Sequence, residues 1–125
     1  MINIEIVKYF HTILIEEFGG SNGIRDLNAL NAAIQRPYTT FDDKDLYPTI
    51  IDKAAALVES LVKNHAFIDG NKRIGYVMLR FFLMEYGYDL SASQTEKYKF
   101  IIEISKGNLD FEGIKKWIVH HTQEI

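Results

Sequence analysis

The segment from Asn71 to Tyr86 is apolar on nearly all sides of a helix, and it constrains the fold more than any other part of the sequence. Its large apolar residues are Val77, Met78, Leu79, Phe81, Phe82 and Leu83. A helix of this kind is stable in water only when other elements cover several of its faces. The sequence therefore predicts a central, buried helix that ends near Gly87, with a bundle of other helices around it.

Helix-capping residues precede most of the other segments that show helical apolar spacing. Side chains suited to the N-cap position stand at Asn3, Asp26, Ser93 and Asp110. Glu96 completes a capping box with Ser93. Residues that stop helices follow three of these segments, at Gly19, Pro37 and Gly107. Pro48 is expected in the first turn of a third helix. The pattern predicts one all-α domain over residues 1–125.

The helical spacing also predicts which side chains form the core. The expected core face of the first helix consists of Ile6, Phe10, Leu14 and Phe18. That of the third helix consists of Ile50, Ala54, Leu57, Leu61 and Val62. Met78 and Met84 are predicted to fill the core, as methionines usually do. His120 and His121 are predicted to lie in a solvated C-terminus, because adjacent helical residues do not face the same way.

Residues 38–47 show no helical stripe and are expected to form a connecting loop or a small flap, with extended backbone as an open alternative. Strand patterns are weak in the rest of the chain. The predicted fold is therefore a compact helical bundle, with this flap as its one irregular part.

Composition excludes several classes of function. The formal net charge of -3 argues against a protein that wraps nucleic acid, which needs a basic face. The absence of cysteine excludes a thiolate nucleophile and a cysteine-based zinc site. The N-terminus has no basic region typical of a signal peptide. The apolar stretch from Ile74 to Met84 is interrupted by Arg80 and is too short to span a bilayer. A cytoplasmic protein without membrane contact is expected.

The segment from Asn64 to Arg73 joins two predicted core helices and contains an unusual density of polar residues. Loops held by rigid elements often carry catalytic groups. The free N–H groups and the dipole of the following helix make its start near Gly70 and Asn71 a natural phosphate cradle. Lys72 and Arg73 in its first turn oppose the usual preference for acids there, and a bound anion would offset this mismatch.

Three further residues complete the predicted site. Asp69 lies just before the cradle, and a carboxylate beside nucleotide phosphates is the usual protein ligand for Mg²⁺. His65 is the only loop residue that titrates near neutral pH, so it is the candidate general base for a hydroxyl nucleophile. Phe67 is expected to anchor the loop in the core. Each residue alone has an ordinary structural explanation as a cap, a turn or a solvated charge, but their combination favours a site.

This loop resembles the signature loop of the Fic/Doc superfamily. The matching residues, in order, are His65, Phe67, Asp69, Gly70, Asn71 and Arg73. Lys72 stands at the position that is Gly in typical Fic adenylyltransferases and Lys in the Doc (death-on-curing) branch. Further Doc-like segments are Phe18–Asp26, Leu46–Pro48 and Gly107–Asp110. The resemblance extends over nearly the whole chain.

The resemblance implies an activity, cofactors and partners. His65 would be the catalytic base, Asp69 would hold Mg²⁺, and the residues that bind the phosphates of ATP would be Gly70, Asn71, Lys72 and Arg73. The Doc branch is known for a kinase toxin that phosphorylates elongation factor Tu and is neutralised by an antitoxin. In the family the flap lies beside the active site and helps to align the target protein. The flap residues concerned here are Thr39, Thr40, Phe41 and Asp42.

Departures from the family pattern leave alternatives open. Ala66 replaces the usual Pro. Tyr76 replaces a second Arg that grips the γ-phosphate in Fic enzymes, which favours phosphate transfer over the usual adenylyl transfer. Gly70, however, is Fic-like. The alternatives are therefore a protein adenylyltransferase or a non-catalytic binding module. Fic proteins often carry an inhibitory helix, and no convincing copy of its motif is found near either end of the sequence, so inhibition by a separate antitoxin is expected.

Overall fold

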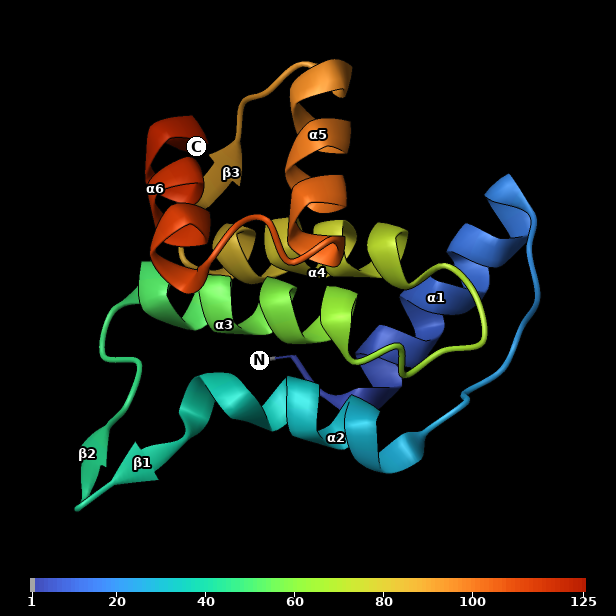
Figure 1. Ribbon diagram of the computed structural model, residues 1–125, viewed down its shortest axis with the longest axis horizontal. Helices are drawn as coiled ribbons and strands as arrows, with labels where there is room; N and C mark the ends of the chain where they lie inside the picture. Colours follow the sequence, from blue (N-terminus) through green and yellow to red (C-terminus); the bar gives the residue numbers. More distant parts are fainter. Residues whose placement is uncertain (1) are drawn as a thin grey trace.

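The computed structural model describes residues 2–125, which form six α-helices, one 3-10 helix and two small antiparallel sheets (Figure 1). In chain order the elements are α1 (Ile4–Phe18), α2 (Leu27–Gln35), η1 (Arg36–Tyr38), β1 (Thr40–Phe41), β2 (Lys44–Asp45), α3 (Ile50–Lys63), α4 (Asn71–Glu85), β3 (Tyr88–Leu90), α5 (Gln94–Ser105), α6 (Phe111–His121) and β4 (Thr122–Glu124). The predicted helical bundle is confirmed. Across residues 2–125, no helix has the length and apolar character needed to cross a bilayer.

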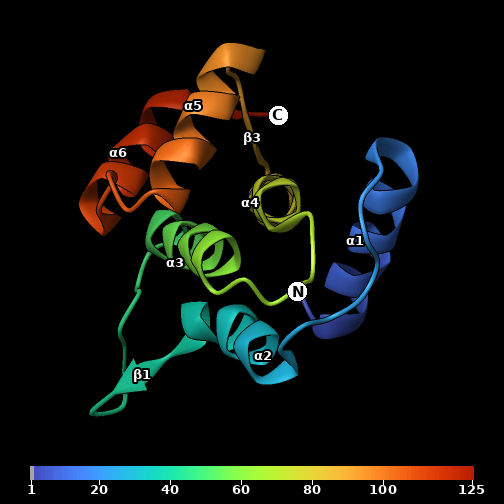
Figure 2. The same cartoon turned by 45° about the vertical axis from the view of Figure 1, so that its right-hand side comes forward.

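Helix α4 is the centre of the bundle, as predicted. Figure 2 looks along α4, with α1 on one side and α3, α5 and α6 on the other. Its buried residues are Ile74, Gly75, Met78, Leu79, Phe82 and Leu83. Helix α3 packs very closely on α4 at Gly75. A Cβ at this position would come within 2.6 Å of the Val62 side chain. Met84, in the last turn, is 47% exposed, so the prediction that it fills the core is wrong.

The predicted helix starts agree with the structure at four places. Asn3, Asp26, Ser93 and Asp110 each accept a backbone hydrogen bond from the first turn of their helix. The prediction for α3 is wrong, because Pro48 lies outside the helix. Thr49 is its cap and forms a capping box with Asp52, with hydrogen bonds of 3.0 and 3.2 Å. This reciprocal pair sets the start of the helix at Ile50.

The buried stripe of α1 is shifted by one residue from the predicted one. Val7, His11 and Ile15 are the buried positions, whereas Phe18 is 61% exposed. The predicted positions Ile6, Phe10 and Leu14 lie beside this stripe and are half-buried. The shift places a histidine in the middle of the face that packs on α4 and on the loop before it.

The flap is a two-stranded hairpin that pairs Thr40 with Asp45 and Phe41 with Lys44. Its turn residues Asp42 and Asp43 have φ angles of 53° and 60°, as a two-residue hairpin turn requires. The expected extended flap is thus present, in the segment between η1 and α3.

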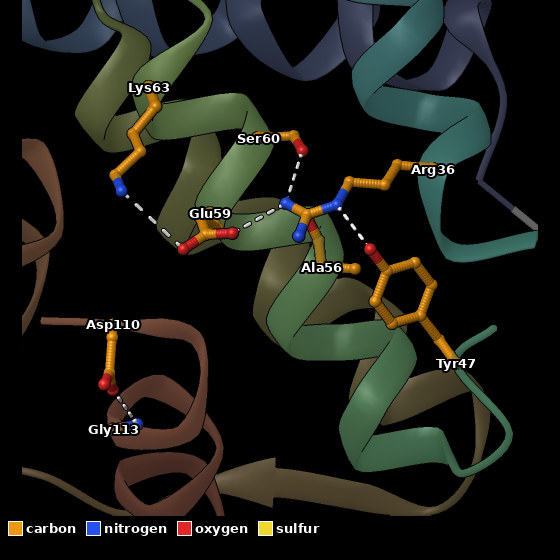
Figure 3. A network of polar contacts seen from close by, with 8 residues as sticks. All are labelled: Arg36, Tyr47, Ala56, Glu59, Ser60, Lys63, Asp110 and Gly113. Atoms are coloured by element: carbon orange, nitrogen blue, oxygen red, sulfur yellow. Dashed lines mark hydrogen bonds and ion pairs between the residues drawn. The ribbon is translucent and has the colours of Figure 1, made fainter. Parts of the chain in front are cut away.

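Arg36 fastens the base of the flap to α3 (Figure 3). Its guanidinium donates to the Tyr47 hydroxyl at 3.0 Å, to Glu59 at 2.8 Å and to Ser60 at 2.9 Å. Lys53 adds hydrogen bonds to backbone carbonyls on both sides of the flap, at Pro37 and Tyr47. The base of the hairpin is therefore fixed to α3 at Lys53, near the start of the helix, and at Glu59 and Ser60 in its second half.

The C-terminal segment is more ordered than predicted. Strand β4 pairs with β3, with Thr122 opposite Leu90. The ring of His121 stacks on Trp117 at 4.0 Å and lies 3.2 Å from a Glu96 oxygen. The prediction of a solvated C-terminus is therefore wrong for His121, because the strand pairing folds this end of the chain back onto the bundle.

Candidate active site

The predicted loop connects the end of α3 to the start of α4 along one side of the bundle. Phe67 is buried, at 2% exposure, and pairs as an isolated bridge with Ile24. His65 and Asp69 are exposed. The loop thus has an apolar centre that faces the core, with one polar residue on either side that faces solvent.

A second loop, from Gly19 to Asp26, runs against the first. The N–H groups of Arg25 and Asp26 both donate to the Ala66 carbonyl, at 2.7 and 3.0 Å. Ile68 donates in turn to the Gly23 carbonyl at 3.0 Å. These main-chain bonds join two segments that are some forty residues apart into one unit.

The backbone of His65 is held in an unusual conformation, and the residue is exposed. Its φ of 49° lies in the left-handed region, which costs free energy for a non-glycine residue. The Arg25 Nε donates to the His65 carbonyl at 2.8 Å and stabilises this conformation. Across residues 2–125, no hydrogen bond to the ring is found, so the imidazole is available to an incoming group.

The side-chain amide of Asn71 stabilises the loop through two hydrogen bonds to the backbone of Phe67. Its Oδ1 accepts a hydrogen bond from the Phe67 N–H, and its Nδ2 donates to the Phe67 carbonyl, both at 3.0 Å. Both polar atoms of the side chain are therefore engaged within the loop. Asn71 is one of the predicted phosphate-binding residues, and only its backbone N–H is left to donate to an anion.

The start of α4 has no side-chain cap. Gly70 occupies the N-cap position in the left-handed conformation, with φ 78°. The other α-helices within residues 2–125 all have a side-chain hydrogen bond at their start. The first N–H groups of α4 have no partner inside the helix. The helix start therefore keeps its donors and its partial positive charge for an external group.

Lys72 and Arg73 add two cations to this helix start. Both side chains are exposed, and neither forms an ion pair with any residue from 2 to 125. The Arg73 guanidinium lies 4.5 Å from the ring centroid of Phe18, itself exposed. An anion at this place would gain both charges and the helix dipole together.

The carboxylate of Asp69 stands at the edge of this positive region. Its Oδ1 accepts a hydrogen bond from the Gly70 N–H at 2.9 Å, and its Oδ2 accepts one from the Ser21 N–H at 3.2 Å. Residues 2–125 contain no cluster of three or more ligating side chains. The Asp69 carboxylate fits Mg²⁺ as part of a shared site. Beside nucleotides, this metal is usually bound by one or two carboxylates together with the phosphates.

His11 is a part of this region that the sequence analysis did not identify. It is 2% exposed, its Nε2 lies 2.7 Å from the Asp69 carbonyl oxygen, and its ring stacks on Phe67 at 3.8 Å. The available signal was its spacing of four from Val7 and from Ile15, which places a histidine on an apolar stripe.

The structure does not bring the flap to the loop. Thr39, Thr40, Phe41 and Asp42 precede α3, whereas His65 follows it, and both views place the hairpin at the opposite end of the helix (Figures 1 and 2). The expectation that the flap lies beside the site is therefore not met. Its role in aligning a target stays a prediction.

Tyr76 lies one turn beyond Lys72 on α4, at the position of the second Arg of Fic enzymes. Burial raises the pKa of its phenol to about 12, so the side chain is neutral. Its hydroxyl is buried and finds no hydrogen-bond partner among residues 2–125. Residue 76 therefore supplies no positive charge of its own, and the cation over its ring is that of Lys97 on α5, with the Nζ 5.6 Å from the ring centroid.

Fold and site together define a helical bundle protein with a structured loop and an uncapped, positively charged start of its central helix. The chain belongs to the Fic/DOC family, whose family model matches residues 1–83 and so includes the whole loop. A region of 75 residues, 60% of the chain, is 47% identical to Toxin Doc of Mycolicibacterium smegmatis (strain ATCC 700084 / mc(2)155). That region spans 58% of this relative's length. The predicted family is confirmed, and the similarity to Toxin Doc agrees with its Doc branch.

Proposed function

We propose that this chain is a Doc-type toxin that transfers the γ-phosphate of ATP to a Ser or Thr hydroxyl of a target protein. The observation that carries the proposal is the uncapped start of α4, with Lys72 and Arg73 beside it and an exposed His65 nearby. Similarity to Toxin Doc supports the toxin part of the proposal.

Each residue has a role that follows from its place. The N–H groups of the first turn of α4, with Lys72 and Arg73, bind and orient the nucleotide phosphates. His65 accepts the proton of the target hydroxyl as that oxygen approaches the phosphate. Asp69 would hold Mg²⁺, which when bound supplies positive charge that offsets the charge of the transferring group.

Tyr76 supports γ-phosphate transfer over transfer of AMP. A neutral phenol provides no charge at the point where Fic adenylyltransferases, by resemblance, grip the γ-phosphate with an Arg. Without that grip, the γ-phosphoryl group can pass to the target hydroxyl, as its bond to the bridging oxygen breaks and ADP departs as the leaving group. Adenylyl transfer remains the second candidate, because Gly70 matches the Fic pattern at the cradle.

Labelled ATP separates these two reactions. The protein is incubated with Mg²⁺, elongation factor Tu as the first target and ATP labelled in either the α or the γ position. We expect label in the target only from the γ position, with the mass of one phosphate added to the intact target. Label from the α position and the added mass of AMP would replace the kinase proposal with the adenylyltransferase.

Expression in cells tests the toxin and the binding-module alternative. We expect growth arrest when the chain is expressed in the cytoplasm alone and relief when an antitoxin from a neighbouring gene is expressed with it. His65→Asn is the control, because Asn tolerates the left-handed backbone of this position and cannot act as a base. Equal arrest by wild type and His65→Asn would instead favour a module that acts by binding.

A further inference from the structure

His11 links α1 to the peptide that precedes the start of α4. Its side chain is one of three buried polar or charged side chains found within residues 2–125. Its Nε2 lies 2.7 Å from the carbonyl oxygen of Asp69. Because a carbonyl oxygen only accepts hydrogen bonds, Nε2 carries the hydrogen and donates it.

This bond fixes the direction of the whole Asp69–Gly70 peptide. Peptide units are planar and trans, so the N–H of Gly70 points away from the carbonyl that His11 holds. That N–H donates to Oδ1 of Asp69 at 2.9 Å. The imidazole therefore orients, through one rigid peptide, both the Asp69 carboxylate and the turn into α4.

Gly70 leaves room for this arrangement. A Cβ at this position would lie 3.4 Å from Nε2 of His11 and 3.4 Å from the side chain of Ile15. A Cβ would therefore just contact α1, and it is the φ of 78° that favours glycine here. His11 is the polar group that α1 presents at this position.

We propose that His11 is a positioning residue: it holds the Asp69–Gly70 peptide so that the Asp69 carboxylate and the first N–H groups of α4 face the same nucleotide. It does not touch the reacting atoms. The proposal rests on the proposed function for the identity of the ligand, and on the geometry alone for the orientation of the peptide.

The alternative is that His11 only packs the core. Its ring lies parallel to that of Phe67, with centroids 3.8 Å apart and planes 10° apart. Two variants separate the contacts. His11→Phe keeps an aromatic ring against Phe67 and removes the donor, whereas His11→Gln keeps an N–H donor at similar reach and removes the ring.

The first measurement needs no nucleotide. The amide resonance of Gly70 reports on its peptide, since a hydrogen bond to the Asp69 carbonyl shifts the amide nitrogen that follows it. We expect His11→Phe to shift this resonance and to speed the hydrogen exchange of Gly70, and His11→Gln to stay close to wild type. Thermal unfolding of each variant shows how much stability was lost.

The second measurement is Mg²⁺-dependent ATP binding by calorimetry. We expect His11→Phe to weaken binding by about tenfold or more, the usual effect of removing a group that orients a metal ligand. His11→Gln should recover most of the affinity even though it is the less stable variant. His121→Phe is the matched control, because this ring also stacks on an aromatic residue but lies on α6, away from the loop.

The positioning and packing hypotheses predict opposite rankings of His11→Phe and His11→Gln in both measurements. If His11 only packs the core, His11→Phe behaves like wild type and His11→Gln is worse in both measurements, which would overturn the proposal. If wild type fails to bind Mg-ATP, the proposed function is refuted. The Gly70 resonances of the two variants then still decide whether His11 orients the peptide.

Discussion

The starts of α3 and α4 are built in opposite ways. At α3, Thr49 and Asp52 exchange reciprocal hydrogen bonds, and the Asp52 carboxylate also pairs with Lys115 at 2.6 Å. An acid therefore stands near the positive end of the helix and has its own partner. This start is complete without any external group.

At α4 the same position is a glycine without a side-chain bond, and the first turn contains Lys72 and Arg73. Two cations at the positive end of a helix are unfavourable by a few tenths of a kcal/mol each. Under the proposed function, the comparison teaches that this bundle separates stability from binding. The start of α3 contributes to folding, whereas the start of α4 leaves donors and charge for a ligand.

Removal of the His65 ring should give the largest effect, and it should change only the rate of the proposed phosphate transfer. We expect His65→Asn to slow phosphate transfer by about 100-fold or more, the usual contribution of a general base. Unfolding in urea and ATP affinity should stay near wild type, because the ring is exposed and makes no hydrogen bond within residues 2–125. A large loss of stability would show that the exposed ring has a structural role after all.

Asp52→Ala should have the next largest effect, on folding alone. The variant loses the capping box of α3 and leaves Lys115 without its closest partner. We expect the free energy of unfolding to fall by about 2 kcal/mol. ATP affinity, measured at a temperature where the variant is folded, should not change. A parallel loss of affinity would contradict the separation of the two helix starts.

Lys72→Gln should change binding and stability in opposite directions. We expect ATP affinity to fall about tenfold, since a charged hydrogen bond to phosphate is worth about 1.5 kcal/mol or more. The nucleotide-free protein should become slightly more stable, because one unfavourable cation is removed from the start of α4. Calorimetry and thermal unfolding measure the two effects, and a loss of both affinity and stability would refute the idea that Lys72 serves binding at the expense of folding.

Low pH should give the smallest of these effects, a loss of the stability that the Asp52 carboxylate contributes at the start of α3. Burial raises the pKa of Asp52, but hydrogen bonds from Lys115 and Thr49 outweigh it, so that the pKa lies below its ordinary value. Stability from this carboxylate is therefore present above the unfolded pKa of about 3.9 and is lost as the pH falls through the lower folded value. Asp52→Asn should flatten the stability profile in this acidic range. An unchanged profile would assign the acid sensitivity to other groups.

The helix starts were predictable wherever signal and partner are neighbours in sequence. Asp26 and Ser93 bind N–H groups three residues away, so their caps could be predicted before the fold was known. The start of α3 was misplaced because Pro48 and Thr49 are both start signals, and only the structure shows which one the helix uses. Local chemistry also pointed to the loop from Asn64 to Arg73.

Features that depend on long-range contacts could not be predicted in this way. His11 contacts Asp69 across 58 positions of the chain, and spacing alone does not tell which face of α1 is buried. The pairing of β3 with β4 likewise joins distant segments, and neither strand has a clear alternating pattern. The engagement of Asn71 with Phe67 depends on the path of the loop, which the residue types do not specify.

The bonds that hold the loop reach far along the chain, from Arg25 to His65 and from His11 to Asp69. The loop therefore takes its shape only after α1 and the segment that follows it have docked. Native-state hydrogen exchange should accordingly show the Ile68 amide opening together with α1 and before the middle of α4. A molecule with α1 detached would retain most of its helices and all the side chains of the proposed site, but not the shape of the loop. If the proposed function holds, circular dichroism would then overestimate the active fraction of a preparation.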